Sequence, residues 1–113
     1  METTPPLKRG RELDEAFFRA LGYEQRLRWD GYTFAKGNHW IEHCVHPSLN
    51  GEGLTFVLQE MLKRDHTFTI GAVTTGPTTI YVVKSRLITL AGEFLPETVT
   101  RVALALLQEL SIV

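Results

Sequence analysis

The chain has 113 residues, of which 43% are apolar and 22% are charged, and its formal net charge is −1. These values are typical of a globular domain and argue against a disordered chain or a broadly basic nucleic-acid-binding surface. No stretch approaches the roughly 20 apolar residues that cross a bilayer, and no signal-peptide pattern opens the chain, so we expect a cytoplasmic protein.

The first residues are rich in threonine and proline and offer little that a core would bury. We therefore expect residues 1–9 to form a flexible tail. The remaining residues, 10–113, have the length of a single domain, which would bury roughly two-thirds of the surface that its unfolded chain exposes.

Residues 11–21 have the pattern of an amphipathic helix. Apolar residues recur at spacings of three and four, which places on one helical face Leu13, Ala16, Phe17, Ala20 and Leu21. Acidic residues in the first turn favour the helix dipole, and Gly22 is typical of the left-handed residue after a helix. The pattern predicts that this face is buried.

Residues 23–49 give a weaker pattern. The dipeptide Asp30-Gly31 is typical of a tight hairpin turn between two short strands, and residues 37–46 would add a further strand. This segment is the most aromatic part of the chain, with Trp29, Tyr32, Phe34 and Trp40. These aromatic residues would either fill a core or contact a partner, and core packing is the simpler interpretation.

The run HWIEHCVH places His39, Glu42, His43, Cys44 and His46 within eight positions. Imidazole and thiolate are good zinc ligands, but the spacing matches no recognised zinc finger. In a strand, His39 and His43 would face away from Cys44 and His46. We therefore predict no metal and no cofactor, and we keep a small metal-dependent enzyme that uses the His39–His46 cluster as an alternative.

The rest of the chain has three clear periodic segments. Helical spacing predicts helices over residues 51–64, with Asn50 as N-cap, and over residues 96–110. Between them, alternation predicts an antiparallel hairpin over about 67–73 and 79–90, with Phe68, Ile70 and Ala72 on a buried face. The fold class is therefore α+β, with a small antiparallel sheet centred on this hairpin and packed by three amphipathic helices.

Two groups of basic side chains suggest a binding site for an anionic ligand. Arg26 and Arg28, with Lys84 or Arg86 from neighbouring subunits, would line a pocket for a small anion. This arrangement would make the protein an oligomeric sponge that sequesters an anionic nucleotide signal. Solvated surface charge is the simpler interpretation of each group.

The chain has RELDEAFFRALG as its first helix, PSLNGEGLTFVLQEML ahead of FTIGAV, and FLPETVTRVALALL at the end. In this order, these segments resemble the phage ABA sandwich domain. The resemblance implies a small protein encoded by a phage or prophage and assigns no functional residue. The residues between the first two helices have no counterpart in that family.

From these observations we predict a non-enzymatic binding protein. The expected function is that of a phage-encoded inhibitor of a host defence system, comparable to an anti-CRISPR protein, acting by protein–protein contact in the host cytoplasm. Its partner would be a host protein or a protein–nucleic acid complex, and a homo-oligomer and direct nucleic-acid binding stay open. The predicted binding residues are Arg26, Arg28, Trp29, Tyr32, Phe34, His39 and Trp40.

Overall fold

Three helices and two small antiparallel sheets make up residues 7–111, the part of the chain that this computed structural model describes, with side chains described to residue 108. The helices are α1 (Arg11–Ala20), α2 (Gly51–Leu62) and α3 (Leu95–Ser111). The strands are β1 (Glu24–Arg28), β2 (Gly31–Lys36), β3 (His39–Trp40), β4 (Thr69–Thr75), β5 (Thr78–Lys84) and β6 (Thr89–Gly92). This confirms the predicted α+β class.

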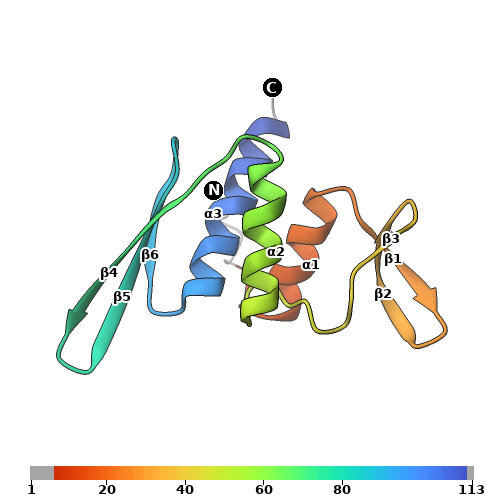
Figure 1. The fold of residues 1–113 in the computed structure, drawn as a ribbon, viewed down its shortest axis with the longest axis horizontal. Helices are drawn as coiled ribbons and strands as arrows, with labels where there is room; N and C mark the ends of the chain where they lie inside the picture. The colour runs from red at the N-terminus through yellow and green to blue at the C-terminus, as the bar shows by residue number, and fades with distance from the viewer. Residues whose placement is uncertain (1–6, 112–113) are drawn as a thin grey trace, which may run out of the picture.

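The helices lie side by side in the centre, and the two sheets lie on opposite sides of them (Figure 1). One sheet has the strand order β1-β2-β3 and the other has the order β4-β5-β6. The core lies between the helices and the near face of each sheet, and its fully buried residues include Phe17, Val57, Met61, Val83 and Leu106. None of the described helices combines the length and the apolar character that crossing a membrane requires.

Helix α1 begins after Gly10 and ends before Gly22, both with positive φ angles. Leu13 and Phe17 are buried as predicted, whereas Ala20 is exposed. Phe18 is buried instead, because α1 contacts α3 on one side and its Phe18 ring packs on β2 on the other. The buried face of this helix is therefore rotated toward Phe18 relative to the predicted face.

Helix α2 is capped as predicted, since the Asn50 side chain accepts a hydrogen bond from the Gly53 N–H at 2.8 Å. The helix ends at Leu62, two residues before the predicted end. Helix α3 begins at Leu95, and its predicted apolar stripe is confirmed by four fully buried residues, Val99, Val102, Ala103 and Leu106. The side chain of Leu110 and residues 112–113 lie outside the described part.

The predicted hairpin forms between β4 and β5, with Gly76 and Pro77 as its turn. The predicted second strand, residues 79–90, is two strands. Strand β5 ends at Lys84, where the Ser85 side chain accepts a hydrogen bond from the Ile88 N–H at 3.0 Å and the Ser85 N–H bonds the Ile88 carbonyl. This turn reverses the chain, so β6 returns beside β5.

The predicted buried face of Phe68, Ile70 and Ala72 is confirmed only in part. Phe68, just before β4, is partly buried against the core, whereas the predicted burial within β4 is wrong. Ile70 and Ala72 are exposed, as is every other residue of β4. The hairpin extends past the helices (Figure 1). Helix α3 contacts β5 and β6, and Val83 of β5 is fully buried. The alternating pattern predicted the strand correctly, but it did not determine how far the helices would cover it.

Residues 24–40 form the other sheet. The predicted hairpin is present, but its turn lies at Trp29-Asp30, one residue before the predicted Asp30-Gly31, because Arg28 pairs with Gly31. Gly31 has a φ angle of 113°, which only glycine adopts readily. Strands β1 and β2 pair over their full length, and the short β3 pairs with the end of β2. Residues 1–6 of the predicted tail lie outside the described part, whereas Leu7 is held to α3 through its carbonyl, which accepts a hydrogen bond from Arg101.

The buried segment Pro47-Ser48 contacts all three helices near their N-terminal ends. The Ser48 hydroxyl accepts a hydrogen bond from the Gly10 N–H at 2.8 Å, and its own N–H donates to Asp14 at 2.7 Å. The Thr100 hydroxyl donates to the Pro47 carbonyl at 2.8 Å. Gly53, in the first turn of α2, lies directly against the backbone before Pro47.

We expect Gly53→Ala to destabilise the fold, because a Cβ at this position would overlap the His46 carbonyl. The expected loss in the free energy of unfolding is about 1 to 3 kcal/mol, the usual range for overpacking. The control is Gly51→Ala in the same turn, where nothing lies within 4 Å of the added methyl group. We expect it to be neutral or stabilising by up to about 1 kcal/mol. Urea unfolding of both variants measures the difference, and equal stabilities would contradict the close contact.

Candidate functional site

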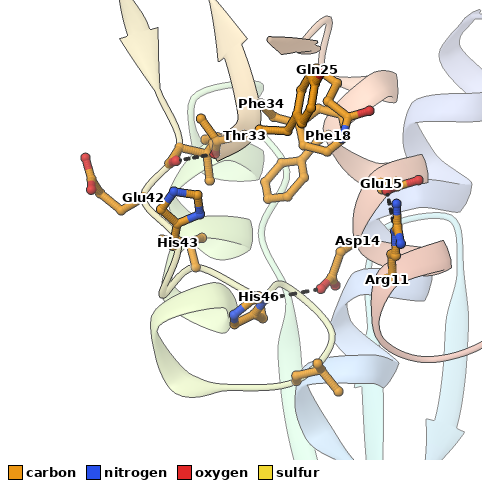
Figure 2. Close-up of a pocket in the computed structure, with 14 residues that line it drawn as sticks. Arg11, Asp14, Glu15, Phe18, Gln25, Thr33, Phe34, Glu42, His43 and His46 are labelled. Carbon is orange, nitrogen blue, oxygen red and sulfur yellow. Dashed lines mark hydrogen bonds and ion pairs between the residues drawn. The ribbon is translucent and has the colours of Figure 1, made fainter. Parts of the chain in front are cut away.

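A groove of about 540 Å³ lies between α1, the near face of β2 and the loop over residues 41–49. We call it the α1–β2 groove. Figure 2 shows its side chains converging from these three parts of the chain. It is lined by Arg11, Asp14, Glu15, Phe18, Gln25, Tyr32, Thr33, Phe34, Ile41, Glu42, His43, Val45, His46 and Leu49.

The floor of the groove is apolar and rigidly packed. The rings of Phe18 and Phe34 lie 5.1 Å apart, and Ile41 is buried beside them. The Thr33 hydroxyl, on the other face of β2, donates to the Ile41 carbonyl at 2.6 Å. This bond fixes the loop to the sheet, so the apolar floor is formed before any ligand arrives.

Beyond the groove, the β1–β2 hairpin carries three exposed apolar side chains. Leu27 and Tyr32 are directly opposite each other on the face that Phe34 shares, and they are 66% and 65% exposed. Trp29, at the turn, is 92% exposed. We call these three residues the apolar tip. The alternation of a strand explains the arrangement: the same face that is buried at Phe34 continues past the helices.

The outer face of the same hairpin is held by an ion pair. Arg28 donates two hydrogen bonds to the Asp30 carboxylate, at 2.6 and 2.7 Å, and the two side chains are only 16% and 21% exposed. His43 lies 3.2 Å from the same carboxylate. Arg28 lowers the pKa of Asp30 from 3.8 to about 2, and Asp30 in turn raises the pKa of Arg28. This pair braces the turn that carries Trp29.

The polar rim of the groove is also paired. Asp14 accepts the hydrogen bond from the Ser48 N–H, and His46 lies 3.9 Å from its carboxylate. Burial raises the pKa of Asp14, and the Ser48 hydrogen bonds only partly oppose this effect. Arg11 and Glu15 bond each other at 3.0 Å at the mouth (Figure 2). The rim of the groove therefore presents both acidic and basic side chains.

The structure divides the predicted binding residues into three groups. Trp29 and Tyr32 are exposed at the apolar tip, and Tyr32 also lines the groove. Phe34 is a buried core residue, and His39 lies against the Tyr23 ring. The remaining three share the outer face of the sheet, where Arg28 lies over the Trp40 ring and Arg26 pairs with Glu24.

The cationic residues of the alternative anion pocket do not meet within one chain. Arg26 and Arg28 are in the first sheet and are both paired with carboxylates. Lys84 and Arg86 are in and after β5, in the sheet on the other side of the helices (Figure 1). A pocket built from all of them would require neighbouring subunits, as that hypothesis states.

The histidines and Cys44 each lie in a different place. His43 contacts Asp30, His46 approaches Asp14, and Cys44 is exposed. Among residues 7–111, no three His, Cys, Asp or Glu side chains gather closely enough to hold a metal ion. The histidines and Cys44 are therefore close in sequence but do not converge on one point in the described structure.

Sequence reasoning missed the contribution of α1 and of Leu27 to this site. Asp14 and Phe18 lie four residues apart, so they share a second helical face that turns toward the hairpin. Leu27 alternates with Arg26 and Arg28 in β1, a signal of a strand with one apolar and one charged face. The spacing of Asp14 and Phe18 and the alternation around Leu27 can both be read from the sequence. Neither pattern shows which face of its helix or strand the fold leaves exposed.

Comparison with known proteins adds no assignment to this geometry: the chain matches no protein-family model, no curated protein and no solved structure.

We expect the Asp30 carboxyl to titrate with a pKa of about 2, because Arg28 stabilises its charged form. Carboxyl-carbon NMR measures this directly. Arg28→Gln should move the pKa up toward 3.8, whereas the control Arg26→Gln, which removes a charge paired with Glu24, should leave it unchanged. Since the folded pKa lies below the unfolded one, the pair's contribution to stability is complete above pH about 4 and is lost as the pH falls toward 2. An unshifted Asp30 would contradict the ion pair.

Proposed function

We propose that this chain is a non-enzymatic binding protein that contacts a protein partner through the apolar tip and the adjacent α1–β2 groove. The observation that carries the proposal is the exposure of Leu27, Trp29 and Tyr32 together on one braced hairpin. Aromatic side chains dominate the binding energy of protein interfaces, and a rigid hairpin loses little conformational entropy on binding.

The groove supplies the second half of this surface. Its apolar floor and its paired polar rim resemble the anatomy of protein interfaces, in which a desolvated centre is surrounded by polar groups. A partner would receive the apolar tip in its own pocket and place an apolar side chain over Phe18 and Phe34. Asp14 and Asp30 both accept hydrogen bonds from neighbouring groups of the chain, so their carboxylates hold the loop and the turn in place. This structural use of both carboxylates supports a binding role rather than a catalytic one.

The resemblance to the phage ABA sandwich domain indicates which partner to test first. We propose a component of a host defence system, with the chain acting as a phage-encoded inhibitor in the host cytoplasm. The assay counts phage plaques on cells that carry a candidate defence system, with and without expression of the chain. Expression should restore plaque formation, and unchanged plaque counts across the tested systems would contradict the inhibitor role.

We expect Trp29→Ala to weaken partner binding by about 2 kcal/mol or more, which is roughly thirtyfold in Kd. Because Trp29 is 92% exposed, the same change should leave the free energy of unfolding within about 0.5 kcal/mol of the parent value. Titration calorimetry against the component of the defence system that the chain inhibits measures the affinity, and urea unfolding measures the stability.

The matched control for this variant is Leu87→Ala, which removes another exposed apolar side chain, in the turn between β5 and β6. We expect it to leave partner affinity unchanged. Equal affinity of the parent and Trp29→Ala would place the interface elsewhere and overturn the proposed surface.

A further inference from the structure

Strand β4 is an unprotected edge of the second sheet. It runs for seven residues without a charged side chain or a proline, and all seven are exposed. Its large apolar side chains, Ile70 and Val73, are 40% and 58% exposed. Folded proteins usually protect such an edge with charges, a proline, a bulge or a covering segment, because its free N–H and C=O groups pair with any other strand.

The other sheet edges of the described structure do carry such protection. Strand β1 has three charged residues, Glu24, Arg26 and Arg28. Strand β3 is only two residues long, and β6 is four residues long with Gly92 packed close to Thr98 of α3. Among the described strands, β4 is therefore the edge that combines length, lack of charge and exposure.

The hairpin geometry shows which backbone groups of β4 are free. Thr75 and Thr78 flank a two-residue turn, so they are directly hydrogen-bonded to each other. In an antiparallel pair such residues alternate with residues whose backbone groups point away from the neighbouring strand. The outward residues of β4 are then Ile70, Ala72 and Thr74.

We propose that β4 pairs antiparallel with β4 of a second copy of this chain, about a two-fold axis at Ala72. In this register Ile70 lies opposite Thr74 of the other copy and Ala72 lies opposite itself. The outward N–H and C=O groups of each strand then lie opposite those of the other strand. The three residue pairs give about six backbone hydrogen bonds. The two three-stranded sheets become one six-stranded sheet.

The side chains of β4 fit a second copy for three reasons. The strand is uncharged, so two copies bring no like charges together. Gly71 lies opposite Val73 of the other copy, which leaves room for the larger side chain. An antiparallel strand pair also has two-fold symmetry by itself, which is the commonest symmetry of homo-oligomers.

The size of this contact predicts a reversible dimer. A seven-residue strand pair is about 24 Å long, which places the interface at the small end of specific protein contacts. We therefore expect a dissociation constant in the micromolar range. The paired edge lies across the helices from the apolar tip, so the dimer and the proposed partner surface are separate (Figure 1).

Sedimentation velocity of the full chain over about 1 to 500 µM tests the dimer, with an expected rise from the monomer to the dimer coefficient. Val73 is on the face of β4 away from Val83 and the helices, so Val73→Lys and Val73→Glu leave the core intact. Val73 and its symmetry mate are diagonal neighbours in the proposed pair. Each variant alone should dimerise at least tenfold more weakly, and an equimolar mixture of the two should recover association.

Cross-linking tests the register. In a Cys44→Ser background, Ala72→Cys should form a disulfide-linked dimer, since directly opposed Cα atoms lie about 5.5 Å apart. Thr69→Cys should not, because its symmetry mate lies about 20 Å away. Equal cross-linking of both variants would overturn the register.

The partner surface supplies the control. Leu27→Lys changes the apolar tip and should leave dimerisation unchanged, whereas Val73→Lys should leave partner binding unchanged. A strict monomer up to about 500 µM would overturn the self-pairing, and it is also the result expected if β4 accepts a strand of another protein.

Discussion

The arrangement of the three helices depends on one buried segment, Pro47-Ser48, and on the hydrogen bonds that it makes. Ser48 bonds Gly10, the residue before α1, and Asp14 of α1, while the Pro47 carbonyl accepts a hydrogen bond from the Thr100 hydroxyl of α3. Buried polar groups of this kind are costly when unpaired, so each bond restricts the packing of its helix. The consequence is a central layer of helices whose N-terminal parts are all held to this segment.

This central layer leaves each sheet only partly covered. On one side, Phe34 packs on Phe18 while Leu27 and Tyr32 extend beyond the helices. On the other side, Val83 is fully buried, yet the whole of β4 lies outside the helical layer. The helices are too few to cover two sheets, and the uncovered parts are where we place both the partner surface and the self-pairing edge.

The two exposed regions differ in how they are prepared for contact. The first hairpin is braced by the Arg28–Asp30 ion pair, which fixes its aromatic tip before binding. Strand β4 has no ionic support and offers mainly backbone groups, which suit another strand rather than a side-chain pocket. The first hairpin is thus suited to contact through rigid aromatic side chains, and β4, on the other side of the helices, is suited to strand pairing.

The sequence by itself determined the elements. The three helices, the Asn50 cap and the two hairpins follow from periodicity and turn chemistry, although the first hairpin turns at Trp29-Asp30, one residue before the predicted position. Tertiary structure decided exposure. Alternation showed that Ile70 and Ala72 share a face, but only the position of the helices left that face exposed. Likewise, HWIEHCVH is compact in sequence, yet its turns direct His43 to Asp30 and His46 to Asp14. Local patterns report the conformation of neighbouring residues, whereas a binding surface depends on contacts between segments far apart in the chain.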